Sequence, residues 1–157
     1  MKNILCYGDS NTWGLIPGTQ NRFPQNVRWT GLLQEKLKTK GIQIPEEGLC
    51  GRTTIFEDSL QYIPAENILV VSPLHLGESV WKPQYDPEFD EISVETSKQL
   101  HAEYKKTAHR KNVRIIAASD FVKASETDQE HLDEIGHWIL AEAIYQALNS
   151  MNISIFS

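Results

Sequence analysis

The chain has 157 residues, which suffices for one domain with a sizeable core, and its 40% hydrophobic and 23% charged residues are typical of a globular protein. The formal net charge of −6 and the scattered basic residues argue against a nucleic-acid partner, because phosphate binding needs a clustered cationic face. No stretch approaches the ~20 apolar residues that span a bilayer, and the apolar run before Gly8 is too short for a signal-peptide core. We therefore expect a cytoplasmic protein without a membrane partner.

The first half of the chain contains one clear strand and one clear helix. Residues 3–7 form a short apolar run that Gly8 ends, which predicts a buried strand. The segment 28–40 carries apolar residues at helical spacing, and Gly41 is a natural C-terminal stop. The other expectations for this half are a loop over 8–27, a brief strand at Ile42 and Ile44 that ends at Pro45, and a turn-rich region over 48–67 with room for one short helix.

The second half repeats this alternation. Residues 68–71 and 113–117 are continuous apolar runs and predict strands buried on both faces. Between them we expect a long loop over 73–91 and a helix over 92–110, with an apolar stripe of Ser97, Leu100, Tyr104 and Ala108. The clearest helix lies near the end, where apolar residues recur at helical spacing: Leu132, Ile135, Ile139, Leu140, Ala143, Ile144, Ala147 and Leu148.

Strands separated by helices predict a single layered α/β domain over residues 1–157 with a mostly parallel sheet. Ligands in such folds bind beyond the C-terminal ends of the strands. Ser10 follows the first strand, and residues 128–131 follow a later one. The two cysteines have no metal-ligand spacing around them; Cys6 is expected in the core and Cys50 in a loop, and a disulfide between them is not favoured in a reducing compartment.

Ser10, Asp128 and His131 are the three groups that acyl transfer needs. A histidine can take the proton of the serine hydroxyl, and a carboxylate three residues earlier can curl back to orient the ring. Each residue alone has a plainer structural explanation: Ser10 in a turn, Asp128 as a solvated loop acid, and His131 at a helix start. The other histidines, including His137, have no partner spacing and are expected to be structural or exposed.

Five blocks, taken together and in order, carry a family resemblance. They are GDSNTWG at 8–14, RFP at 22–24, RWTG at 28–31, EEGLCGRTT at 46–54 and DQEHLDEIGH at 128–137. The set closely resembles the SGNH (GDSL) hydrolase superfamily, in particular its small bacterial arylesterases and acyltransferases. The resemblance is almost continuous over residues 2–58 and looser over 68–149.

This resemblance implies a flavodoxin-like α/β/α sandwich that hydrolyses carboxylic esters without a metal or cofactor. It implies Ser10 as nucleophile, His131 as general base and Asp128 as its orienting acid, with an oxyanion hole from the N–H groups of Ser10 and Gly51. The residues themselves favour Gly51 as well, because a glycine in a tight loop can turn its amide toward a developing negative charge.

One family block is missing. Nothing between Cys50 and Pro73 matches the Gly-x-Asn-Asp motif, whose asparagine supplies a third oxyanion donor, so one strand–helix unit is absent or lies in a segment that this sequence lacks. Asn11 and Asn67 are the nearby asparagines, and Asn11 is the better candidate donor. Either the sheet closes up, with the strand 68–71 beside the first strand, or it presents an unpaired edge, and we therefore predict a homodimer or larger oligomer.

Aromatic residues are candidates for the substrate pocket. Trp13 and Trp81 are proposed to line it, with Asn11, Tyr85 and Phe89, although packing under the loop or in a subunit contact explains these aromatics equally well. Arg22 and Arg52 either bind a substrate carboxylate or form structural salt bridges.

The leading function predicted from the sequence is a serine ester hydrolase acting on small acyl esters, with acyl transfer to other alcohols as a further activity. The alternative is a degenerate family member, weakly active or inactive, that binds a small ligand or a partner. A flavodoxin-like nucleotide binder ranks third, because no phosphate-cradling Gly-rich loop follows the first strand.

Overall fold

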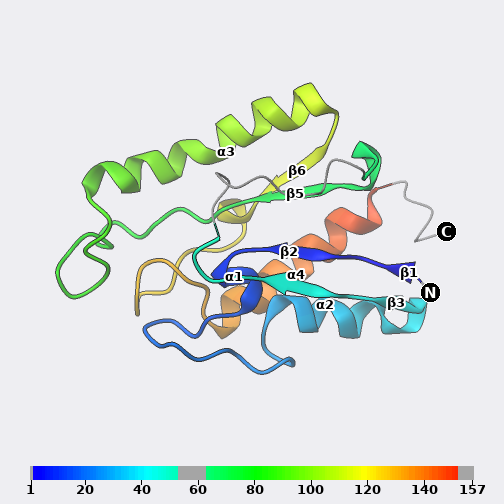
Figure 1. The fold of residues 1–157 in the computed structure, drawn as a ribbon, viewed down its shortest axis with the longest axis horizontal. Coiled ribbons are helices and arrows are strands. Elements are labelled where there is room, and N and C mark those ends of the chain that lie inside the picture. Colours follow the sequence, from blue (N-terminus) through cyan, green and yellow to red (C-terminus); the bar gives the residue numbers. More distant parts are fainter. Residues whose placement is uncertain (1, 53–62, 152–157) are drawn as a thin grey trace.

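Parallel strands form the middle layer of the structure, a computed structural model that describes residues 2–52 and 63–151 (Figure 1). Strands β1 (Lys2–Asn3) and β2 (Cys6–Gly8) run beside β3 (Ile42–Gln43) and β4 (Glu46–Gly48), and β5 (Leu69–Ser72) runs beside β6 (Arg114–Ala117). Every pairing is parallel, as the alternation of strands and helices predicts.

The strand that contains Ile42, β3, ends at Gln43, as the brief strand predicted before Pro45 requires, and a separate strand that was not predicted, β4, begins at Glu46. Backbone hydrogen bonds of 2.9 Å from Ile4 N to Gln43 O and from Cys6 N to Pro45 O bridge the gap between the two short pairings. Proline lacks an N–H but keeps its carbonyl, and this suffices here because the strand is hydrogen-bonded on one side only among the described residues.

Helices cover both faces of the strand layer. Helices α2 (Trp29–Leu37) and α4 (Glu134–Asn149) pack together on one face, and α3 (Glu91–Lys111) lies on the other, next to β5 and β6 (Figure 1). Short 3₁₀ helices follow α2 at Lys38–Lys40, precede β5 at Ala65–Asn67 and follow β6 at Ala118–Asp120. This is the predicted α/β/α sandwich.

The element boundaries follow local signals. Gly41 ends the α2 segment with a φ of 68°, and α3 starts at Asp90, whose side chain accepts a hydrogen bond from Ser93 N. One helix was not predicted: α1 (Ser10–Trp13) lies inside the expected loop over 8–27. The turn-rich region over 48–67 falls partly outside the described residues.

The core lies between α2, α4 and the strands. Leu33, Leu37, Ile42 and Leu132 have no exposed surface. The apolar phase predicted for the last helix is wrong at Ile135, which is 68% exposed. The helix begins at Glu134, so Leu132 precedes it. The helical spacing counted from Leu132 therefore placed Ile135 on the wrong face. Cys6 is buried and Cys50 exposed, and both are free thiols.

The strands fall into two separately paired groups. Among the described residues, β2 pairs with β4 and β5 with β6, so the predicted closure of β5 onto the first strand is wrong. Leu69, Val70 and Val71 are only half-buried, as are Ile115 and Ile116 on β6, and this contradicts the burial predicted for both strands. Oligomerisation stays a prediction.

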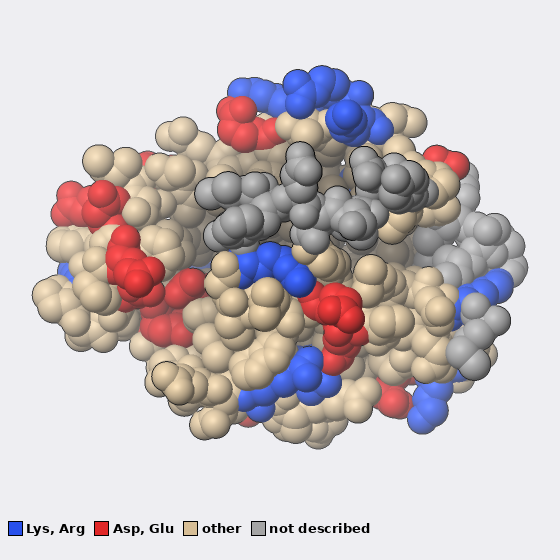
Figure 2. All heavy atoms as spheres, viewed as in Figure 1, with Lys and Arg blue, Asp and Glu red and all other residues tan. Residues whose placement is uncertain are grey.

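Surface charge is divided into small groups. Figure 2 shows basic side chains in separate patches on the visible face rather than in one cationic surface. Lys105, Lys106, Arg110 and Lys111 are exposed on α3, as predicted for its solvated side. None of the helices among the described residues is long and apolar enough to cross a membrane.

His137 is fully buried in α4. Its Nδ1 accepts a hydrogen bond of 3.3 Å from Trp29 N, and Phe23 contacts its ring edge-on. Its Nε2 has no hydrogen-bond partner among the described residues. Burial lowers the pKa of His137 to about 4, so the folded protein binds a proton there less readily than the unfolded chain does.

We expect this histidine to make the fold sensitive to acid. As the pH falls from 6.5 toward 4, the unfolded state gains the proton first, and the folded state loses about 3 kcal/mol of stability from this group. Urea unfolding of the protein and of His137→Gln at several pH values measures the effect. The stability difference between the two should shrink as the pH falls, and a difference independent of pH would contradict the assignment.

Candidate active site

Ser10 lies at the C-terminal end of β2, as the first residue of α1. Asp9 caps this short helix by accepting a hydrogen bond of 3.0 Å from Asn11 N. Gly8 is required at the end of the strand, because a side chain there would collide with Thr12. The sequence GDSNT thus makes a tight turn from strand to helix that holds the Ser10 hydroxyl in place.

His131 joins Ser10 to Asp128. Its Nε2 lies 2.8 Å from Ser10 Oγ and its Nδ1 lies 2.9 Å from Asp128 Oδ2. Because an ionised carboxylate only accepts hydrogen bonds, the proton is assigned to Nδ1, and Nε2 is free to accept from the serine hydroxyl. The structure therefore brings together the three residues that the sequence proposes, from two loops more than a hundred residues apart in the chain.

Asp128 is held by backbone donors from two segments. Gly18 N donates to Oδ2 at 3.1 Å, and Glu130 N and His131 N donate to Oδ1 at 3.1 and 3.0 Å. Burial by itself raises the pKa of Asp128, but the hydrogen bonds from His131 and from the backbone lower it to about 2. Asp128 is thus a fixed negative charge at neutral pH.

Burial and the neighbouring carboxylates shift the pKa of His131 in opposite directions. Burial lowers its pKa, but the hydrogen bond to Asp128 and the charges of Glu130, Asp128 and Asp9 outweigh burial, so the net effect raises the pKa above the ordinary value of 6.5. The site therefore favours the protonated ring, which is the form that a general base reaches during catalysis.

Asn11 connects the two loops through its side-chain oxygen. Its Oδ1 accepts a hydrogen bond of 2.9 Å from Leu132 N, so it ties α1 to the residue after His131. Asn67 precedes β5, whereas Ser10 follows β2, so Asn67 lies at the N-terminal end of its strand and Ser10 beyond the C-terminal end of its own. Asn11 as the third oxyanion donor stays a prediction, because its amide NH₂ rather than Oδ1 would donate.

The loop of Gly51 is anchored to the end of β2. Leu49 N donates to Gly8 O at 3.0 Å, and the Arg52 guanidinium donates to Gly8 O at 2.9 Å and also to Glu47 O. The same guanidinium stacks on the Tyr7 ring with 3.8 Å between its central carbon and the ring centroid. Gly51 itself has a φ of 75°, a conformation that favours glycine. Its N–H as an oxyanion donor stays a prediction.

Arg22 and Arg28 converge on Glu46 at the start of β4. Both reach Glu46 Oε2 at 2.7 Å, and Thr30 Oγ1 donates to Oε1 at 2.6 Å. Arg22 Nε also donates to Trp13 O. These contacts favour the structural alternative for Arg22, because its donors are engaged by the fold. The same holds for Arg52 with its two carbonyls.

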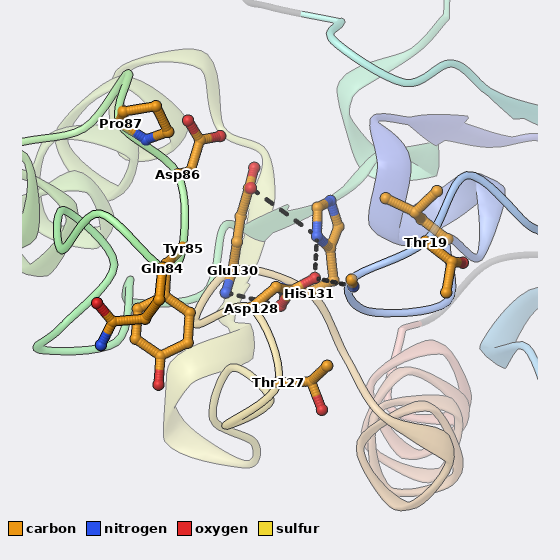
Figure 3. A pocket seen from close by; sticks show the side chains of 11 residues that line it. Thr19, Gln84, Tyr85, Asp86, Pro87, Thr127, Asp128, Glu130 and His131 are labelled. Atoms are coloured by element: carbon orange, nitrogen blue, oxygen red, sulfur yellow. Dashed lines mark hydrogen bonds and ion pairs between the residues drawn. The ribbon is translucent and has the colours of Figure 1, made fainter.

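A cavity of about 380 Å³ lies beside the His131 ring (Figure 3). The predicted aromatics Trp13 and Trp81 are not among its lining residues: Trp13 packs against Arg22, and Trp81 Nε1 donates to Glu78 O at 3.2 Å. Their role in substrate binding stays a prediction. The lining residues are Leu15, Gly18, Thr19, Gln84, Tyr85, Asp86, Pro87, Thr127, Asp128, Glu130 and His131.

The sequence argument included Tyr85 among the aromatic candidates but missed Gly18, Asp86 and Glu130. Gly18 donates through its backbone, which no side-chain pattern reveals. Glu130 had a signal, because it stands between Asp128 and His131 in a four-residue turn. Within residues 2–52 and 63–151, no group of His, Cys, Asp and Glu side chains has the arrangement of a metal site.

Solved structures with a similar fold include esterases. An aryl esterase from M. smegmatis matches with a TM-score of 0.78 and 24% identity, covering 96% of this chain and 100% of that one. A carbohydrate acetylesterase from Sinorhizobium meliloti matches with a TM-score of 0.77 and 25% identity over 96% of this chain and 99% of that one. A lipolytic G-D-S-L family protein from Veillonella parvula has a TM-score of 0.61 and 13% identity over 96% and 98% of the two chains. No protein-family model matches, and neither does any curated protein.

The layered parallel architecture and these neighbours define the fold. The chain has the fold of these esterases and of the G-D-S-L family protein, which is the fold that the resemblance to SGNH (GDSL) hydrolases predicts.

Proposed function

We propose that the protein is a serine ester hydrolase that cleaves small carboxylic esters through an acyl-enzyme. The observation that carries this proposal is the unbroken chain of hydrogen bonds from Ser10 Oγ through His131 to Asp128, with distances of 2.8 and 2.9 Å. A serine is a weak nucleophile until a base takes its proton, and this arrangement supplies the base and fixes its tautomer.

In the first half of the reaction, Ser10 Oγ bonds to the ester carbonyl carbon while its proton passes to His131 Nε2. The imidazolium then gives this proton to the leaving alkoxide as the carbon–oxygen bond breaks, which leaves an acylated serine. In the second half, His131 Nε2 takes a proton from water as the water oxygen bonds to the acyl carbon. The imidazolium then returns this proton to Ser10 Oγ as the bond between serine and the acyl carbon breaks and the acid leaves. An alcohol in place of water gives acyl transfer, the second activity that we propose.

The developing oxyanion is assigned to the N–H groups of Ser10 and Gly51. Ser10 N lies at the start of α1, and the hydrogen bonds of Leu49 and Arg52 hold the Gly51 loop against Gly8. The loss of one oxyanion donor typically costs 10²–10³ in rate, so a site with these two donors alone still permits a slow esterase. The missing Gly-x-Asn-Asp motif supports the alternative, a weakly active or inactive protein that binds a small ligand.

The names of the similar structures suggest which esters to try first. They are described as an aryl esterase and a carbohydrate acetylesterase. We propose small acyl groups such as acetyl as substrates, on aromatic or sugar alcohols.

A fluorophosphonate probe tests the proposal. We expect the wild type to be labelled and to hydrolyse p-nitrophenyl acetate, and Ser10→Ala to do neither, because the probe reacts only with an activated serine. Ser72→Ala is a matched control: Ser72 Oγ also lies 2.9 Å from a histidine, His101, but it is fully buried at the end of β5. Labelling should survive in this variant.

Absence of labelling in the wild type would overturn the esterase proposal and favour the ligand-binding alternative. Labelling that persists in Ser10→Ala would show that another residue reacts.

A further inference from the structure

A second carboxylate lies on the same side of the His131 ring as Asp128. Glu130 Oε2 is 3.8 Å from His131 Nδ1, against 2.9 Å for Asp128 Oδ2 (Figure 3). The Glu130 side chain is 30% exposed, so its charge is only partly screened by solvent. At this separation an ionised carboxylate favours the positively charged form of the ring.

The backbone of the turn brings Glu130 to this place. Gln129 has a φ of 64°, in the left-handed region, and its backbone O accepts a hydrogen bond of 2.7 Å from Gly77 N. The N–H groups of Glu130 and His131 both donate to Asp128 Oδ1. The chain therefore curls around the Asp128 carboxylate, and both acids approach Nδ1.

Among residues 2–52 and 63–151, no lysine or arginine lines the cavity beside Glu130, so His131 is its nearest basic group there. Burial raises the pKa of Glu130, as do the negative charges of Asp86, Asp128 and Asp9, while His131 lowers it. The position is unfavourable for a carboxylate unless His131 becomes charged. The groups that face His131 itself are Asp128, Glu130 and Asp9, with His137 of α4 as a more distant base.

From this placement we propose that Glu130 is a positioning residue of the site, which stabilises the His131 imidazolium together with Asp128. When the Asp128 carboxylate is removed, Glu130 can accept the hydrogen bond from His131 Nδ1–H in its place. The role rests on the proposed function, because the imidazolium forms when His131 takes the proton of Ser10. Glu130 exchanges no proton in the wild-type cycle: the proton moves from Ser10 Oγ to Nε2 and onward to the leaving oxygen.

The first test is the pH profile of kcat/KM for p-nitrophenyl acetate in Glu130→Gln. Removing the Glu130 charge destabilises the His131 imidazolium and so lowers the pKa of His131. The acid limb should therefore move to lower pH, and the plateau of kcat should fall about three- to tenfold. Glu126→Gln is a matched control, because it removes the same charge from an exposed side chain of the same loop that contacts Gln129. Its acid limb should stay in place.

A second test uses Asp128→Asn as the background. If Glu130 accepts the hydrogen bond from His131 Nδ1–H in this variant, adding Glu130→Gln should lower kcat by a larger factor than it does in the wild type. Equal factors in the two backgrounds, together with an unmoved acid limb, would overturn the proposal. Circular dichroism and the thermal midpoint establish that each variant is folded.

An NMR titration of the His131 ring separates this proposal from the esterase proposal, because it needs no turnover. In the Ser10→Ala background, Glu130→Gln should move the titration midpoint of the ring to lower pH. A shifted midpoint in a protein without esterase activity would support the charge interaction between Glu130 and His131 but would refute its role in catalysis. An unmoved midpoint in an active enzyme would refute the role of Glu130 alone.

Discussion

Replacing Asp128 with asparagine is expected to lower kcat for p-nitrophenyl acetate by about 10³- to 10⁴-fold. The Asp128 carboxylate accepts hydrogen bonds from His131 Nδ1, Gly18 N, Glu130 N and His131 N. An amide can turn its NH₂ group toward Nδ1, and in those molecules the ring proton moves to Nε2 and the ring can no longer accept from Ser10. The remaining activity comes from the molecules in which Nδ1–H donates to Glu130 instead. Stopped or steady-state assays of the purified variant measure the loss.

Asp120→Asn is the control for this experiment, because Asp120 is an exposed aspartate of the 3₁₀ helix after β6. It should retain the wild-type rate. A loss of less than tenfold in Asp128→Asn would mean that ring orientation is not limiting.

The pH dependence separates the two residues. With a pKa of about 2, Asp128 stays ionised over the usual assay range, whereas His131 must lose its proton to act as a base. Its raised pKa places the acid limb of the wild type above pH 6.5, with activity lost as the pH falls below it. A limb near the pKa of a carboxyl group would contradict this assignment.

The second large effect is on stability, and it concerns Glu46. Replacing Glu46 with alanine is expected to lower the free energy of unfolding by about 3–5 kcal/mol, because the Arg28 side chain, only 11% exposed, is left as an uncompensated charge. Arg22, whose side chain is 34% exposed, can regain water and contributes less. Urea unfolding at pH 7 measures the change.

Two further variants test this explanation. In the background Arg28→Leu, Glu46→Ala should cost much less, because no buried cation is stranded. Burial by itself raises the pKa of Glu46, but hydrogen bonds from Arg28 and Thr30 lower it on balance, so its contribution to stability is present at neutral pH and is lost as the pH falls through that lowered pKa. Equal costs of Glu46→Ala in both backgrounds would refute the stranded-charge argument.

The sequence predicted the convergence of Ser10, Asp128 and His131 because their chemistry and their places after strands both leave a trace in the residue pattern. The strands and main helices were also predictable, since apolar spacing and Gly41 mark them. The helix α1 was not, because four residues between Asp9 and Gly14 contain no helical period. Its start depends on a single cap.

Other features depend on contacts that a linear pattern does not contain. The backbone N–H of Gly18 donates to Asp128, which is 110 residues away in the sequence, and no side-chain pattern reveals such a contact. The half-exposure of β5 follows from which strand lies next to it, and an apolar run is the same whether it is covered or not. The loop aromatics Trp13 and Trp81 were chosen by residue type, and their side chains are directed by Arg22 and by the Glu78 carbonyl.

One side of the cavity wall comes from a different part of the chain than the proposed reacting groups. Ser10, Asn11 and Gly18 meet the turn 128–132, whereas Gln84, Tyr85, Asp86 and Pro87 come from the loop before α3 and share none of the hydrogen bonds that hold Ser10, Asp128 and His131 together. Substitutions at 84–87 can therefore reshape the cavity while Ser10, Asp128 and His131 keep their hydrogen bonds. In a protein with this division, substrate preference can diverge quickly between descendants that keep the same chemistry.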